Sequence, residues 1–423
     1  MPRAYYALPN HRRSSLQLLF SKQYLQSPVD TVYQFSCTKM SISRNLSSNK
    51  ETSISSINRD ADEDLWSKVI SFVRFPLTVG IVFIHFNVAY TFHSSAERPF
   101  YFFYIIDLCS KVLPSIGVPM FFIISGYLFF YRNIFDTSTY RKKLYKRCYT
   151  LLMPFFLWNI IAIGFHLVDM IYLSSDHIHI NITIPRIINT FFNNSGNRGI
   201  FINDHVTNFN EIGFPINVPL WYIRDLFIMV VFSPVTYWII KKTGIFFIIV
   251  LFPIWFNGPS ILPPGIPMLV TALFFFSVGA LFSIRKINPI YILHKLSYIP
   301  LLWILFITLD LIYHLNWYIH RTCMIIGICS FFVIALLFVE RMKMKPCYHI
   351  ANSCFFIYLF HTLIIKYVGN LFITFFMIKN NDSLPILIIY FIVPLVTISI
   401  CFFTYSFLKN YLPNLCKILT GNR

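Results

Sequence analysis

Phe72-Val73-Arg74-Phe75-Pro76-Leu77-Thr78-Val79-Gly80-Ile81-Val82-Phe83-Ile84-His85-Phe86 is an apolar segment that carries one arginine and one histidine. At about 100° per residue, the eleven steps from Arg74 to His85 make three helical turns plus about 20°. The two side chains therefore share one helix face, about 16 Å apart along the axis, with Thr78 between them. Such residues in a membrane helix cost several kcal/mol unless they face protein or water, so we hypothesise a functional role.

The composition is that of a polytopic membrane protein. Of 423 residues, 56% are hydrophobic and only 12% are charged, and the mean hydropathy is +0.62. A soluble domain is far less apolar. The net charge of +18 could suggest nucleic acid as a partner, but the basic residues lie mostly in short loops between apolar spans, where membrane topology explains them better. We expect the lipid bilayer, and no nucleic acid, as a partner.

The nine cysteines are scattered, without a C-x-x-C motif or a paired spacing with histidine. This pattern indicates neither a disulfide framework nor a metal site. We therefore expect no metal.

Two parts of the chain differ in composition. Residues 1–64 are polar and Ser-rich, and we interpret them as a disordered cytoplasmic tail. Translation starting at Met40 would make residues 1–39 an upstream extension. Residues 65–423 form the predicted membrane domain.

We predict an all-α protein with about ten transmembrane helices, each near the roughly 20 residues that a bilayer requires. The fifth span is the shortest. The expected spans are 70–91, 112–131, 149–172, 218–240, 244–257, 266–284, 297–314, 317–339, 351–373 and 384–408.

The basic residues predict the orientation. One side of the expected membrane domain collects seventeen of them: Arg132, Arg141, Lys142, Lys143, Lys146, Arg147, Lys241, Lys242, Arg285, Lys286, Lys295, Arg341, Lys343, Lys345, Lys409, Lys417 and Arg423. The other side has six: Arg98, Lys111, Arg186, Arg198, Arg321 and Lys379. This positive-inside bias predicts that both termini are cytoplasmic. The longest outer loop, about 173–217, could then lie over an entrance to the membrane core.

Further polar residues interrupt the later spans. In the second span Ser125 and Gly126 are small enough for another helix or a ligand to approach, and packing is the commoner reason. In the fourth span Trp221, Arg224 and Asp225 share a helix face, and the charged pair should point inward. In the ninth span Tyr358 and His361 share a face near the midplane.

A basic run, Arg141-Lys142-Lys143-Leu144-Tyr145-Lys146-Arg147, precedes the third span. It suits either a plain positive-inside anchor or a site for an anionic cytosolic ligand, since arginine and lysine bind phosphates. Asp310 and His166 are single polar residues near span ends, and we interpret them as structural.

Taken together, these segments resemble the bacterial integral-membrane acyltransferase family 3, which includes O-acetyltransferases of surface polysaccharides. The resemblance covers about residues 65–408. It rests on five segments in the order of the family: the Arg74-x10-His85 spacing, Val-Pro-Met-Phe-Phe-Ile-Ile-Ser-Gly-Tyr at 118–127, the basic run leading into 152–155, Pro-Leu-Trp-Tyr-Ile-Arg-Asp-Leu at 219–226, and Phe-Phe-Ile-Tyr-Leu-Phe-His at 355–361.

The resemblance implies an acyl-CoA donor, acetyl-CoA or another, on the cytoplasmic side of a bacterial inner membrane, and a saccharide hydroxyl as acceptor on the outer side. Arg74 and His85 match the essential arginine and histidine of the family. The long N-terminal tail departs from it.

The chemistry of the residues agrees with that resemblance. Transfer of an acyl group to a hydroxyl needs a base, and histidine suits this task. We therefore expect His85 to be the general base or a transient acyl carrier, with Arg74 also catalytic. The expected donor-binding residues are Arg74, Arg141, Lys142, Lys143 and Arg147. The expected acceptor-binding residues are Ser125, Tyr127, Trp221, Arg224, Asp225 and His361.

Two other functions fit the same residues. A transporter or flippase of a saccharide or lipid-linked saccharide would also line its path with arginine, histidine and aspartate, and would not depend on acyl-CoA. A non-catalytic component of a polysaccharide assembly complex would use the 173–217 loop as its contact surface.

Overall fold

The computed structural model describes residues 61–86, 100–132, 135–172, 178–194, 198–203, 213–263, 266–377 and 383–422. Residues Asp62–Arg423 form one compact unit, and almost all of the other unit, Met1–Ala61, lies outside the described residues. The predictions for the polar tail before Ala61 and for Met40 therefore stay predictions.

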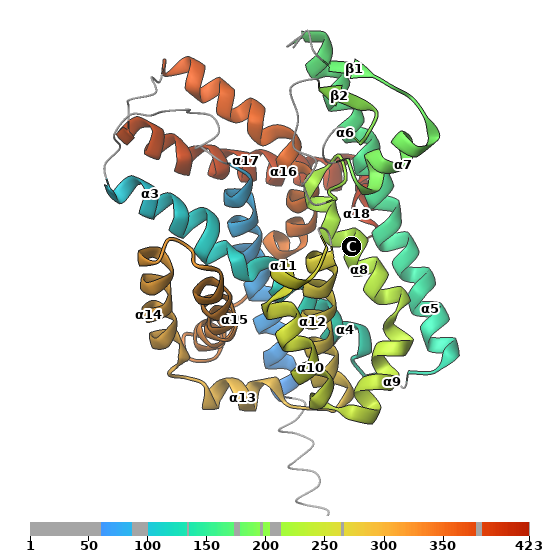
Figure 1. Cartoon of the computed structure of the whole chain (residues 1–423), viewed down its shortest axis with the longest axis vertical. Coiled ribbons are helices and arrows are strands. Elements are labelled where there is room, and N and C mark those ends of the chain that lie inside the picture. The colour runs from blue at the N-terminus through green and yellow to red at the C-terminus, as the bar shows by residue number, and fades with distance from the viewer. Residues whose placement is uncertain are drawn as a thin grey trace, which may run out of the picture. The chain divides into compact units, whose positions relative to one another are not determined.

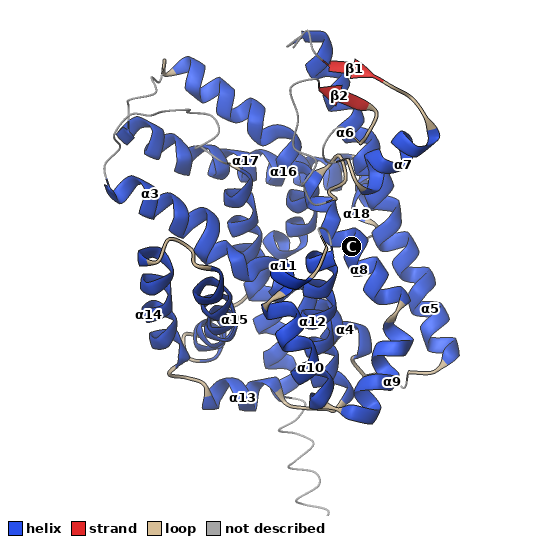
Figure 2. Ribbon diagram, viewed as in Figure 1, coloured by secondary structure: helices blue, strands red, loops and turns tan. Residues whose placement is uncertain are grey.

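Helices dominate the described residues (Figure 2). The first helix is Ala61–His85. It is followed by α3 (Phe100–Asp107), η1 (Leu108–Val112), η2 (Leu113–Ile116), α4 (Gly117–Phe130), α5 (Thr137–Arg147), η3 (Cys148–Leu152), α6 (Met153–Tyr172), α7 (Ile184–Phe192), η4 (Val218–Leu220), α8 (Trp221–Val231), α9 (Ser233–Thr243), α10 (Ile245–Phe256) and α11 (Gly258–Ile261). The C-terminal part contains α12 (Ile266–Ile284), α13 (Pro289–Lys295), α14 (Ile299–Ile312), α15 (Trp317–Glu340), α16 (Tyr348–Phe375), α17 (Ser383–Tyr411) and α18 (Pro413–Thr420).

The helices confirm the predicted fold class. Within the described residues, seven helices are long and apolar enough to cross a membrane. Two bent pairs, α8–α9 at 62° and α13–α14 at 71°, raise the number to nine if each pair is one span. The predicted fifth span coincides with α10, an apolar helix of only 12 residues. The cytoplasmic placement of the termini stays a prediction.

The first helix begins four residues before the predicted boundary of the membrane domain. Asp62, Glu63 and Asp64 occupy its first turn, where acidic side chains are favoured by the helix dipole. The Glu63 carboxylate accepts hydrogen bonds from the Tyr131 hydroxyl at 2.5 Å and from Arg132 Nε at 2.9 Å, which ties the turn to the end of α4. The helix therefore includes residues 61–64, which the composition alone placed in the polar tail.

A close crossing of α4 and α12 lies at the centre of the bundle (Figure 1). A Cβ atom added to Gly126 would lie 2.1 Å from the Phe276 backbone oxygen, and one added to Gly279 would lie 1.9 Å from the Ile123 oxygen. Small residues allow two membrane helices this approach. Gly126 therefore serves helix packing, one of the two roles that the sequence left open.

The described part of the 173–217 segment contains regular secondary structure. Strands β1 (Ile178–Ile180) and β2 (Phe201–Asn203) pair in antiparallel register, and α7 lies between them. His166 of α6 stacks on Phe201 with ring centroids 5.4 Å apart, which fits its structural interpretation. At the other end of the chain, α18 packs against α6 and α17, and Trp158 Nε1 donates to the Leu419 oxygen at 2.9 Å.

We expect Gly126→Ala to destabilise the protein by roughly 1–3 kcal/mol, because the new methyl group meets backbone atoms that cannot rotate away. The thermal unfolding midpoint of purified protein in detergent measures this loss. Gly164→Ala in α6 is the matched control, since among the described residues no atom lies within 4 Å of a Cβ at that position. Equal midpoints for the two variants would contradict this account of the crossing.

Candidate active site

Arg74, Thr78 and His85 lie on one continuous helix. The helix runs through Pro76, whose ring is exposed on its surface, although proline removes one backbone hydrogen bond. Thr78 is buried, and its hydroxyl donates to the Arg74 backbone oxygen at 2.9 Å. The helical segment thus gives Arg74 and His85 the common face that the spacing predicts.

The neighbour of His85 comes from the far end of the chain. The ring centroids of His85 and His361 are 5.2 Å apart, and the two rings are tilted by 55°. His361 is completely buried in α16, and its Nδ1 lies 2.9 Å from the Ile357 backbone oxygen. Tyr358 is adjacent, with its ring centroid 6.4 Å from that of His361, and its hydroxyl donates to the Pro219 oxygen. The predicted shared face of Tyr358 and His361 is thus present.

Tyr222 connects several candidate residues. Its hydroxyl is 3.1 Å from the hydroxyl of Ser125, and its ring packs edge-on against that of Tyr358 at 5.9 Å. Tyr222 therefore links Ser125 of α4 to Tyr358 of α16.

Arg74 and Arg147 are partly buried cations that need a counter-charge. Within the described residues, no carboxylate lies within ion-pair distance of either guanidinium. Each ion pair of the described chain involves other side chains, such as Arg132 with Glu63 and Lys68 with Asp64. An arginine in this situation suits an anionic ligand, because its planar fork matches carboxylate and phosphate.

The basic run divides into inward and outward residues. Asp136 caps α5, and the hydrogen bonds that its carboxylate accepts from Thr139 lower the pKa of Asp136. Arg141 and Lys142 are exposed, whereas Lys143 bends back so that its Nζ donates to the Phe129 oxygen. Arg147 is partly buried at the end of α5, and η3, which follows it, packs against α8, the helix that carries Tyr222.

Arg224 and Asp225 pair with each other, with 2.8 Å between Nε and Oδ1. The other end of the guanidinium donates to the backbone oxygens of Phe192 and Gly213, each at 2.7 Å. Arg224 thus links α8 to the 173–217 segment. Trp221, one turn earlier, packs against Phe122 with ring centroids 6.4 Å apart.

Tyr127 lies apart from the histidines. It is buried against Trp66 and Tyr131, with ring centroids 5.8 Å and 5.4 Å away, at the end of the bundle where the first helix begins. The structure therefore brings Ser125, but not Tyr127, to the Tyr222 region.

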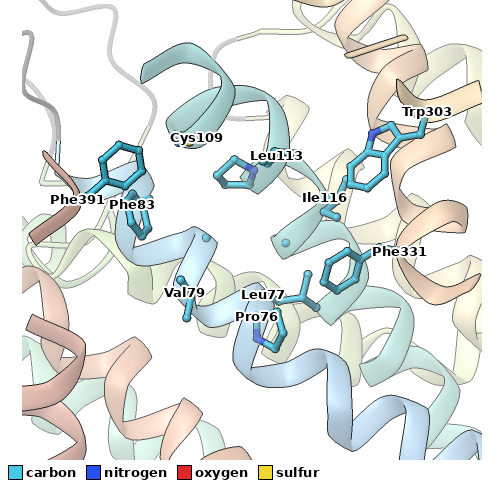
Figure 3. Close-up of a pocket in the computed structure, with 13 residues that line it drawn as sticks. Pro76, Leu77, Val79, Phe83, Cys109, Leu113, Ile116, Trp303, Phe331 and Phe391 are labelled. Carbon is cyan, nitrogen blue, oxygen red and sulfur yellow. The ribbon is translucent and has the colours of Figure 1, made fainter. Parts of the chain in front are cut away.

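An apolar groove of about 270 Å³ borders the first helix on the side opposite to Arg74 and His85 (Figure 3). Its walls include Pro76, Phe83, Trp303 and Phe331. Phe83 follows Arg74 by nine residues, which is about 180° around a helix. The groove is therefore separate from the face of Arg74 and His85, and apart from the Cys109 thiol and the Trp303 indole N–H its lining is apolar.

A buried amide network, which the sequence alone did not predict, fixes the site. Asn217 Nδ2 donates to the Leu359 oxygen at 3.1 Å, Thr362 Oγ1 donates to Asn217 Oδ1 at 2.9 Å, and the Asn217 backbone N–H donates to Asn159 Oδ1 at 3.2 Å. Asn159 and Asn217 in an apolar context were the available signal. Among the described residues, no group of three His, Cys, Asp or Glu side chains is arranged to hold a metal ion.

Comparison with known proteins identifies the family of the chain. The family described as "Acyltransferase domain" (Acyl_transf_3) matches residues 68–405. The succinoglycan biosynthesis protein ExoH of Rhizobium meliloti (strain 1021) is 26% identical over 377 residues, which cover 84% of this chain and 92% of that protein. No solved structure matches. The chain therefore belongs to the Acyl_transf_3 family and is a multi-pass membrane acyltransferase.

Proposed function

We propose that the protein is an O-acyltransferase that moves an acyl group from cytosolic acyl-CoA to a hydroxyl of an exported saccharide. The proposed acyl group is acetyl. A bacterial inner membrane is the proposed location. The observation that carries this proposal is the meeting of His85 and His361 inside a membrane acyltransferase, on the helix that also bears Arg74. The name of the relative from Rhizobium, which refers to polysaccharide biosynthesis, supports a saccharide acceptor.

The proposed reaction needs one proton acceptor. His85 takes the proton of the acceptor hydroxyl, the oxygen attacks the thioester carbonyl, and the C–S bond breaks to release the CoA thiolate, which regains the proton. General base catalysis of this kind contributes about 10²–10⁴-fold. A route through an acyl group carried briefly by His85 uses the same residue as nucleophile.

The donor would lie against the arginines. Arg74 and Arg147 are partly buried without a carboxylate partner in the described chain, which suits the phosphates of CoA. Arg141 and Lys142 are exposed and could meet the same ligand at the mouth of the site, whereas Lys143 would act through the end of α4 that it binds.

The acceptor would meet the opposite side of the site. Ser125 is near enough to Tyr222 to contact a hydroxyl held there, whereas His361 would act through the neighbouring His85 ring. Trp221 offers an aromatic surface, while Arg224 and Asp225 would shape the entrance through the outer segment. Tyr127 would act only indirectly, from its contact with Trp66.

Radiolabelled acetyl-CoA supplied to membranes that contain the protein should label an extractable saccharide. His85→Ala should lower this transfer by about 10²–10⁴-fold, because the proton acceptor is lost. Arg74→Ala should also abolish most of it. The measurement is label in saccharide per amount of folded protein, with succinyl-CoA as a second donor.

Two results would contradict the proposal. Full transfer by folded His85→Ala would remove His85 from the chemistry. Absence of transfer by the wild type from both donors, together with acyl-CoA-independent movement of saccharide across the membrane, would favour a flippase.

Arg147→Ala should raise the KM for acyl-CoA roughly 10–100-fold and leave the KM for the acceptor unchanged, because a charge-assisted bond to phosphate contributes about 1.5–3 kcal/mol. Steady-state kinetics with varied donor measure the effect. Lys345→Ala, which removes an exposed cation outside the basic run, is the control. An unchanged donor KM in Arg147→Ala would place the CoA phosphates elsewhere.

A further inference from the structure

The turn of α16 that carries His361 is fixed from two sides. The backbone oxygen of Leu359 and the hydroxyl of Thr362 bond to the Asn217 side chain, and the Tyr358 hydroxyl bonds to the Pro219 oxygen. The residues of α16 that make these three contacts flank His361 in the sequence. The imidazole is therefore held in one place by groups that do not themselves touch it.

One nitrogen of His361 is committed to the backbone. Nδ1 lies 2.9 Å from the Ile357 oxygen. A carbonyl oxygen can only accept a hydrogen bond, so Nδ1 must carry the hydrogen. In the neutral ring Nε2 is then left with a lone pair.

The other nitrogen lacks a donor. Nε2 of His361 is buried and has no hydrogen-bond partner in the part of the chain that the structure describes. A buried acceptor without a donor destabilises a protein, and within a membrane no bulk water can relieve it. The site therefore calls for an N–H or O–H group at this nitrogen.

His85 is the neighbouring ring that can supply an N–H. Its centroid is 5.2 Å from that of His361, and a hydrogen bond of about 2.9 Å between two imidazole nitrogens places the ring centres roughly 5 Å apart. The hydroxyl of Tyr358 is already donated to Pro219.

We propose that His361 is the positioning residue of His85, with its Nε2 accepting the N–H of the His85 ring. This inference rests on the proposed acyl transfer. The bond would fix the His85 tautomer, so that its other nitrogen presents a lone pair to the acceptor hydroxyl. When that nitrogen takes the hydroxyl proton, the bond to His361 stabilises the imidazolium, and the proton later leaves with the CoA thiolate.

The test compares His361→Met, which removes the acceptor, with His361→Gln, whose side-chain oxygen can replace it. His361→Met should lower kcat roughly 10–100-fold with little change in either KM, and His361→Gln should recover a large part of that loss. His349→Met is the matched control on the same helix, since His349 is exposed and bonds only weakly to Ser406 at 3.3 Å. Unfolding midpoints for all three variants separate catalysis from stability.

The outcomes distinguish failure of the proposed acyl transfer from failure of the positioning role of His361. If the wild type transfers no acyl group, the proposed function fails. If the wild type is active and folded His361→Met keeps its full kcat, or if Met and Gln lose kcat equally, the positioning role is wrong while acyl transfer stands.

A measurement on the unaltered protein covers the case in which the variants do not fold. Nitrogen-15 NMR of histidine-labelled wild type should show a protonated Nδ1 and an unprotonated, hydrogen-bonded Nε2 for His361, coupled to an N–H of His85. A proton on Nε2 of His361 would overturn the proposal whatever the activity.

Discussion

A polar side chain buried away from water must find its hydrogen bonds inside the protein. In this site, the arrangement of the helices depends most on how the Asn217 amide meets that requirement. The side chain bonds to α16 through Leu359 and Thr362, while its backbone bonds to Asn159 of α6. Asn217 also directly precedes η4 and α8, which carry Trp221 and Tyr222. One buried residue therefore sets the mutual positions of three elements, and through them the place of His361 beside His85.

The same constraint separates arginines that build the structure from arginines that face the site. Arg224 donates hydrogen bonds to Asp225 and to two backbone oxygens, so its guanidinium stabilises the 173–217 segment. Arg321 is buried between the rings of Trp255 and Trp317, at 4.5 Å and 4.2 Å. Unlike Arg224, Arg74 and Arg147 have no carboxylate partner among the described residues. They are therefore the better candidates for binding an external anion.

The parts of the site that lie on one helix could be predicted from the sequence, because helical spacing is local. The stripe of Arg74, Thr78 and His85 is an example. The contact of His85 with His361 could not be predicted, since it joins helices that are far apart in the chain. The paired strands in the 173–217 segment were also missed, because each has only three residues, too few for a visible alternation.

Under the proposed function, the length of the first helix solves a problem of distance. A donor from the cytosol and an acceptor on the outer side must meet although about 30 Å of hydrocarbon separates the two faces. Arg74 and His85 are about 16 Å apart along the helix, which is roughly half of that thickness. A donor held by its phosphates near Arg74 and extended along this face would bring its thioester to the histidines without a movement of the bundle. The close crossing of α4 with α12 and the amide network at Asn217 keep the surrounding helices rigid, and a fixed path of this kind needs such walls.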